Sequence, residues 1–219
     1  MKFLRDNGLT IVLLLATAAT ILGMLLTGLS VHNEELAQHG APTLSLAQYV
    51  ISGHFLSALF ENWESEFLQM SAYVMLTALL FQRGSAESKD PDESAPQDAD
   101  PAEDARDPHA PLPVRMGGLP RSLYSYSLGL GLFLLFVVSF LMHLSQSAAA
   151  EAAEAMMHGQ PAPSTAEHLL STHMWFESFQ NWQSEFLSTA VLVVLSIFLR
   201  FRGSPESKPV SAPHSETGA

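Results

Sequence analysis

The chain has 219 residues, of which 47% are hydrophobic and 15% are charged, with a net charge of −12 and no cysteine. The lack of cysteine excludes a disulfide framework, thiolate zinc sites and cysteine nucleophiles. The length alone would allow one or two ordinary globular domains. However, residues 8–33 and 122–150 contain no charged side chain, and uncharged apolar stretches of this length are typical of membrane-spanning helices.

The first predicted element is a membrane-spanning helix at about residues 9–29. A helix needs roughly 20 apolar residues to cross a hydrocarbon core of about 30 Å. Lys2 and Arg5 precede the stretch, so a cleaved signal peptide is the alternative. A similar apolar stretch recurs inside the chain, where it cannot act as a signal, and this favours a retained helix.

A loop at 30–62 follows, and it contains a predicted helix start. Ser45 and Gln48 have the spacing of a capping box, in which each side chain bonds to the other residue's backbone N–H. Apolar residues then recur at helical spacing, so we expect an amphipathic helix on the outer surface that ends near Trp63. The pattern leaves open whether this helix continues into the next span.

A second span is expected at about 63–82. Trp63 and Arg83 would anchor its two ends at the membrane interfaces. Residues 90–121 are acidic and rich in proline, which is typical of a disordered linker.

The second half of the chain follows the same plan. Its capping box is formed by Ser164 and Glu167, and its interface anchors are Trp182 and Arg202. The expected segments are a span at about 123–143, an outer loop at 144–181, a span at about 182–201 and a disordered tail at 209–219.

The two halves align with each other at an offset of 119 residues. From 60 to 89, 16 of 30 positions are identical to those from 179 to 208. Residues 1–89 and 122–208 are therefore predicted to be two repeats from a tandem duplication. The predicted fold is an all-α membrane protein with four transmembrane helices in two parallel repeats, each with an outer amphipathic helix.

The basic residues predict the orientation of these helices. All ten Lys and Arg residues lie outside the long loops 30–66 and 145–185. By the positive-inside rule, both termini and the linker are cytoplasmic and the two loops face outward.

Each repeat places one glutamate about one turn inside its predicted span. Glu66 follows Asn62 by four residues, and Glu185 follows Asn181 by the same spacing. A carboxylate inside a membrane is a functional-site hypothesis, because it is costly unless it has a partner or a water-filled cavity. The alternative is that each glutamate lies at headgroup depth or bonds to its asparagine as a structural contact.

Histidines gather on the outward side. Seven of the nine occur in the outer loops or at the end of the third span: His32, His39, His54, His143, His158, His168 and His173. His54 and His173 are equivalent positions, and His143 with these two completes the candidate polar site. His173 and Glu177 stand at i and i+4, a usable metal-ligand spacing on a helix. The first repeat has Ala58 there, so we expect no metal site and no cofactor, with the histidines lining the outer surface.

Three long motifs carry a resemblance to a known family. They are the run Phe3–Thr10, the two Asn-Trp segments around 60–68 and 179–187, and the Arg-Gly-Ser endings at 83–89 and 202–208. Together they resemble a bacterial membrane-protein family catalogued as a domain of unknown function, over the whole chain apart from the linker. The resemblance implies a location in the bacterial cytoplasmic membrane and brings no activity, cofactor or catalytic residue.

Three functions fit these features. We expect a non-enzymatic membrane protein whose partners are the lipid bilayer and a second copy or another membrane protein. The alternatives are a small oligomeric transporter or ion pathway that uses Glu66 and Glu185, and an outward-facing metal binder that uses histidine and glutamate. The sequence shows no catalytic motif and no basic patch for nucleic acid.

Overall fold

The computed structural model describes residues 2–218, and every regular element in that range is a helix, with no strand. The all-helical class predicted from the sequence is confirmed. Contacts divide the chain into two units. Unit 1 comprises Met1–Glu61 and Phe140–Trp175, and unit 2 comprises Asn62–Ser139 and Phe176–Ala219.

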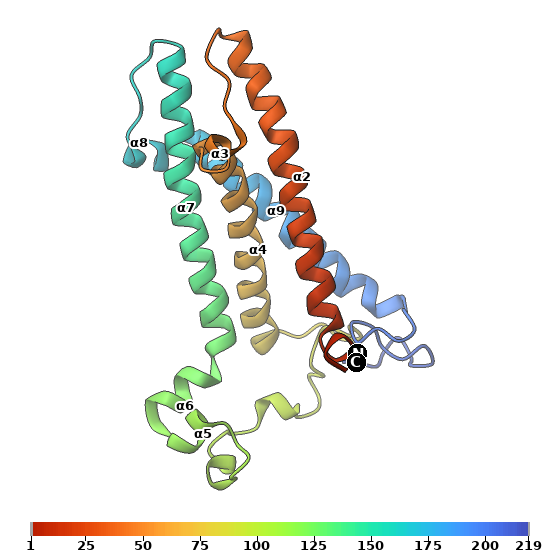
Figure 1. Cartoon of the computed structure of the whole chain (residues 1–219). Coiled ribbons are helices and arrows are strands. Elements are labelled where there is room, and N and C mark those ends of the chain that lie inside the picture. The colour runs from red at the N-terminus through yellow and green to blue at the C-terminus, as the bar shows by residue number, and fades with distance from the viewer. Residues whose placement is uncertain (1, 219) are drawn as a thin grey trace. The chain divides into compact units, whose positions relative to one another are not determined.

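Four long helices make up most of the chain (Figure 1). They are α2 (Gly8–Gln38), α4 (Gly53–Leu79), α7 (Ser127–Met157) and α9 (Thr172–Phe198). α2 and α7 have 31 residues each, and α4 and α9 have 27 each. Each boundary in the second half equals its counterpart in the first half plus 119. The four helices therefore begin and end at equivalent positions of the two halves.

Short helices precede or connect the long ones. They are α1 (Lys2–Asp6), α3 (Leu46–Tyr49), η1 (Pro96–Asp98), η2 (Glu103–Arg106), α5 (Leu112–Met116), α6 (Gly118–Ser125) and α8 (Thr165–Leu169). The third span was expected to start at residue 123, but α7 starts at Ser127. The helix is interrupted at Tyr126, where φ is −115° and ψ is 10°, outside helical geometry.

α2 and α7 are long and apolar enough to cross a membrane. Their most apolar 18-residue windows have mean hydropathies of 2.5 and 2.2, and 0% and 17% of these windows are buried. At 1.5 Å per residue, a helix of this length extends about 46 Å, well beyond a hydrocarbon core of about 30 Å. The polar last turns of α2 therefore continue past the apolar segment as helix, where a loop was expected from residue 30.

Serine side chains determine where the next helices begin. Both capping boxes are confirmed: Ser45 N–H donates to Gln48 Oε1 at 2.9 Å, and the pair Ser164 and Glu167 forms the same motif. A second serine then caps α4, because Ser52 Oγ accepts a hydrogen bond from the N–H of Phe55 at 3.3 Å.

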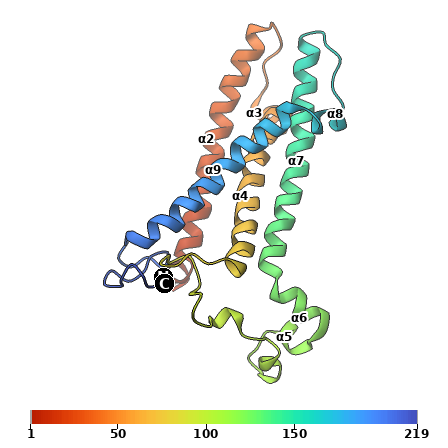
Figure 2. The same cartoon turned by 180° about the vertical axis from the view of Figure 1, so that it is seen from behind.

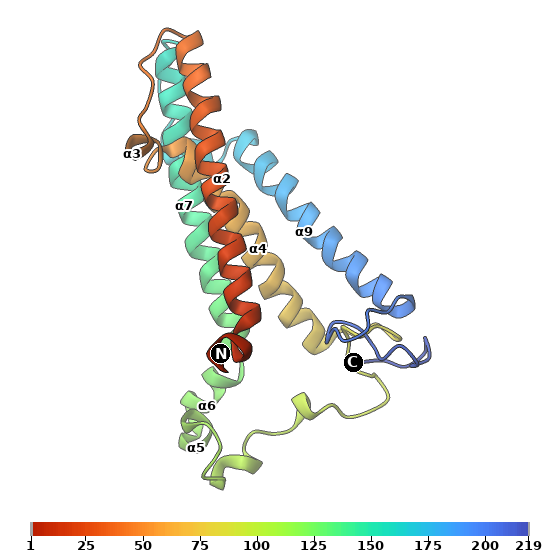
Figure 3. The same ribbon diagram turned by 45° about the vertical axis from the view of Figure 1, so that its right-hand side comes forward.

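Because of this second cap, the amphipathic segment forms two separate helices, α3 and the start of α4. The break lies at residues 50–52, and α4 runs without interruption from Gly53 past Asn62 and Trp63. Ser171 caps α9 in the same way, accepting from the N–H of Met174 at 3.2 Å. The uninterrupted helix α9 can be followed in Figure 2, and Figure 3 shows α3 as a separate short turn at the end of the loop from α2. The expected helix end near Trp63 is therefore wrong.

In unit 1, α4 begins in very close contact with α7. A Cβ atom added to Gly53 would lie 2.8 Å from the carbonyl oxygen of Gln146 and 2.9 Å from the backbone nitrogen of Ala150. Distances below 3.0 Å to backbone atoms cannot be relieved by a side-chain rotation. Glycine at position 53 thus allows the two backbones to approach.

In unit 2, polar side chains connect α4 and its following turn to α9. Gln69 donates to Thr189 Oγ1, and the hydroxyl oxygens of Ser85 and Ser196 are 2.8 Å apart. The buried Lys208 donates to the carbonyl oxygen of Gly84 at 2.6 Å and to three carbonyl oxygens of residues 213–216. These bonds hold together the segments that follow α4 and α9.

The close contact at Gly53 predicts the effect of adding one methyl group. Gly53→Ala should lower the free energy of unfolding by about 1–3 kcal/mol, the usual cost of overpacking. Gly23→Ala is the matched control, because nothing lies within 4 Å of a Cβ at Gly23. Thermal unfolding of the detergent-solubilised variants measures both, and equal stability of the two variants would contradict the contact.

Candidate metal centre

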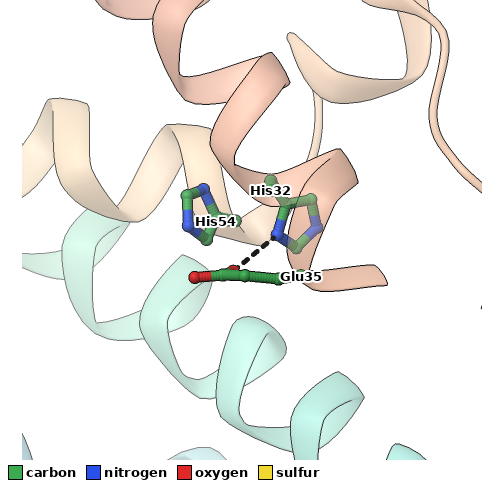
Figure 4. A group of neighbouring side chains, drawn as sticks. All are labelled: His32, Glu35 and His54. Atoms are coloured by element: carbon green, nitrogen blue, oxygen red, sulfur yellow. Dashed lines mark ion pairs between the residues drawn. The ribbon is translucent and has the colours of Figure 1, made fainter. Parts of the chain in front are cut away.

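Two histidines and a glutamate of unit 1 meet between the end of α2 and the start of α4. His32 and Glu35 lie on the last two turns of α2, and His54 lies in the first turn of α4 (Figure 4). Each residue offers one ligand atom, and these atoms all lie within 4.8 Å of one another. We refer to His32, Glu35 and His54 as the histidine cluster.

The two imidazole rings of the histidine cluster are stacked. Their centroids are 4.4 Å apart with an interplanar angle of 28°. His32 Nδ1 lies 3.6 Å from Glu35 Oε2, is buried, and has no hydrogen-bond partner among the described residues. A buried polar nitrogen without a partner costs about 1–3 kcal/mol, so this atom faces a position where an added ligand would be favourable.

Tyr49 of α3 orients His54. Its side chain is only 2% exposed, and its hydroxyl lies 3.0 Å from His54 Nδ1. Because a phenol oxygen can accept as well as donate, Nδ1–H can donate to Tyr49 while the lone pair of Nε2 points elsewhere. Metal-bound histidines are usually held in this way by a partner on the other ring nitrogen.

Gly28, one turn before His32 on α2, makes room for Tyr49. A Cβ atom at position 28 would overlap the Tyr49 hydroxyl oxygen. A side chain at position 28 would therefore push the phenol away from its present position, and glycine leaves room for the contact between Tyr49 and His54.

The electrostatics of the histidine cluster favour a neutral imidazole. Burial lowers the pKa of His54, the charge of His32 lowers it further, and Glu35 opposes both effects. Burial also raises the pKa of Tyr49, with a smaller contribution from Glu35, so the phenol keeps its proton near neutral pH. A neutral ring is the form that binds a metal ion.

Of the three residues in the cluster, the sequence singled out only His54. His32 was noted among the outward histidines but was assigned to a loop, and Glu35 was not considered. The pattern His-x-x-Glu at 32–35 becomes visible as one helix face only when α2 is extended to Gln38, past the predicted end of the span.

The other metal-ligand candidates are not part of this cluster. His173 belongs to unit 1 and Glu177 to unit 2, and the three-ligand group found among residues 2–218 contains neither. His143 of α7 is fully buried in unit 1 and is likewise outside the cluster.

The predicted polar site is divided between the units, with its three histidines in unit 1 and its two asparagines and two glutamates in unit 2. In unit 2 the structure buries a different carboxylate. Asn62 and Glu66 are exposed, Asn181 and Glu185 are half-buried, and the charges of the two glutamates repel each other. The fully buried carboxylate is Glu64, whose Oε1 accepts hydrogen bonds from Ser178 Oγ and Trp182 Nε1, both at 3.2 Å.

The four residues predicted to anchor the spans at the membrane interfaces, Trp63, Arg83, Trp182 and Arg202, differ in exposure and in hydrogen-bond partners. Trp182 donates to Glu64 as described, and Trp63 is 36% exposed. Arg83 forms an exposed ion pair with Asp92 at 2.6 Å, and Arg202 is exposed.

The comparisons with known proteins agree with the family resemblance. A family described as "Domain of unknown function (DUF6766)" matches residues 1–219. No curated protein and no solved structure matches the chain. The match confirms the resemblance to a domain of unknown function, whereas the bacterial membrane location stays a prediction.

The shifted pKa of His54 predicts a pH dependence. A histidine whose pKa is lower in the folded state leaves stability unchanged above its unfolded pKa of about 6.5 and reduces stability as the pH falls below that value. We therefore predict that metal-free protein loses stability below about pH 6.5, and that His32→Gln raises the pKa of His54 by removing a neighbouring positive charge.

Ring-proton NMR titrations in detergent micelles measure this pKa directly. His109→Gln, in the exposed linker, is the control and should leave the titration of His54 unchanged. A His54 that titrates above pH 6.5 in the wild type would contradict the described surroundings.

Proposed function

The chain belongs to the DUF6766 family, a domain of unknown function, and we propose that it is an integral membrane protein that binds a divalent transition-metal ion at His32, Glu35 and His54. The single observation that supports this function is the convergence of three ligand atoms from two helices within 4.8 Å.

The donor set indicates the class of metal ion. Two imidazoles and one carboxylate suit zinc and other first-row divalent ions, whereas magnesium and calcium prefer oxygen ligands alone. Ligand atoms about 2.0–2.1 Å from a tetrahedral ion lie roughly 3.3 Å apart, so the three ligand atoms must close in by up to about 1.5 Å. Glu35, whose side chain is 58% exposed, has the freedom to make most of this movement.

The proposed role is binding rather than catalysis. Three protein ligands leave a fourth position open, and the exposed Glu35 places that position near solvent. The sequence contains no catalytic motif that would use it. The ion would connect the last turns of α2 to the first turn of α4 and hold Tyr49 between them.

The membrane architecture is part of the same proposal. The apolar surfaces of α2 and α7, the matching helix bounds at an offset of 119 and the one-sided Lys and Arg residues support a tandem duplication with four spans and cytoplasmic termini. His32 follows the apolar segment of α2, so the metal would face the outer side. A homodimer or another membrane protein as a partner stays a prediction.

Loss of one ligand should abolish tight metal binding. Loss of a partner that only orients a ligand costs about 10–100-fold in affinity, so His32→Ala and His54→Ala should each cost more than that. Titration calorimetry with Zn²⁺ on full-length protein without a histidine tag measures the affinity. His109→Ala is the control, and wild-type protein without stoichiometric binding would contradict the proposed function.

The orientation can be tested because the chain has no native cysteine. Single cysteines at Ser45 and Ser164 should react with a membrane-impermeant maleimide added to intact cells. A single cysteine at Ser94 or Ser211 should react only after permeabilisation. Labelling of all four positions from the same side would contradict the four-span arrangement.

A further inference from the structure

The second half of the chain carries a different set of residues at the positions of the histidine cluster and its neighbours. At an offset of 119, two positions have the same residue in both halves: Glu35 matches Glu154, and His54 matches His173. Three positions differ, because the second half has Ser147 where the first has Gly28, Glu151 where it has His32, and His168 where it has Tyr49. All of these residues belong to unit 1. Two histidines and two glutamates are therefore available in the second half as well.

In the second half, however, both ring nitrogens of one histidine are already occupied. His168 is fully buried, its Nδ1 is paired with the carboxylate of Glu151, and its Nε2 lies 2.9 Å from Ser147 Oγ. A metal ligand needs a free nitrogen lone pair. Binding a metal through His168 would break at least one of two buried hydrogen bonds.

The residue one turn before His32 on α2, or before Glu151 on α7, determines which side chain the following short helix can place there. This residue is Gly28 in the first half and Ser147 in the second. Gly28 leaves the space that the phenol of Tyr49 fills, and the phenol reaches His54. Ser147 has a side chain at that position, and its hydroxyl meets the shorter ring of His168. The serine thus occupies the space that a tyrosine would need.

The geometry of the rings differs accordingly. In the first half the ring centroids of His32 and His54 are 4.4 Å apart, and the ligand atoms of both lie within 4.8 Å of that of Glu35. In the second half Glu151 replaces one of these rings, so no stacked pair is possible there. The centroids of His168 and His173, which are equivalent to Tyr49 and His54, are 6.5 Å apart, and no three-ligand group among residues 2–218 includes them.

We propose that the chain binds one metal ion, in the first half only. We further propose that three differences between the halves determine which half binds it: Gly28 in place of Ser147, His32 in place of Glu151, and Tyr49 in place of His168. This inference rests on the proposed function. In the second half, the hydrogen bonds of His168 connect α8 to α7 directly, whereas in the first half the ion would connect α2 to α4.

The number of ions per chain tests this inference. Elemental analysis and Co²⁺ titration of the full chain in detergent, without a histidine tag, should give one equivalent for the wild type. His168→Ala and His173→Ala should keep one equivalent, and His54→Ala should bind none.

A swap variant tests the determinants. Ser147→Gly combined with Glu151→His and His168→Tyr gives the second half the first-half set, since Glu154 and His173 already match. This variant should bind two equivalents. A folded swap variant that still binds one, as judged by circular dichroism and gel filtration, would overturn the assigned determinants.

Failure of the inference is distinct from failure of the proposed function. Two equivalents in the wild type, reduced to one by His168→Ala, would overturn the inference and leave metal binding intact. No bound metal in the wild type would overturn both. If the swap variant does not fold, the single variants still test the inference. It would be overturned if His54→Ala still bound one equivalent of metal and the double variant His54→Ala, His168→Ala bound none.

Discussion

The short turn between α3 and α4 places Tyr49 and His54 against the last turns of α2, and the proposed site depends on this contact. Two imidazoles stack there with one buried nitrogen that has no hydrogen-bond partner, beside a carboxylate that can move. Such an arrangement is unfavourable when it is empty and favourable when a cation bridges the three side chains. The cap at Ser52 and the glycines at 28 and 53 are what allow the approach.

The length of the helices explains why the site lies where it does. α2 has about ten residues more than a helix needs to cross a hydrocarbon core, and its polar last turns carry two of the three ligands. The matched α7 carries Ser147 and Glu151 at the same heights. If the chain arose by duplication, the two halves kept their helix bounds and diverged in the side chains that connect each long helix to the following short one.

The sequence predicted the features that depend on local chemistry. Both capping boxes and the two apolar helices followed from spacing and composition, and each is found in the structure. The features it missed depend on contacts between distant residues. The clearance between Gly28 and Tyr49, and the burial of Glu64 rather than Glu66, arise from tertiary packing that a single sequence does not show. The break at 50–52 had a local signal, a serine before a glycine, which the stronger pattern of apolar residues concealed.

The most direct test of the metal centre is the X-ray absorption spectrum of protein loaded with one equivalent of Zn²⁺. We expect an ion with two imidazole nitrogens at about 2.0–2.1 Å and oxygen in the remaining positions, and a loss of imidazole scattering in His54→Ala. A spectrum without imidazole ligands, or one unchanged by His54→Ala, would contradict the proposed metal centre.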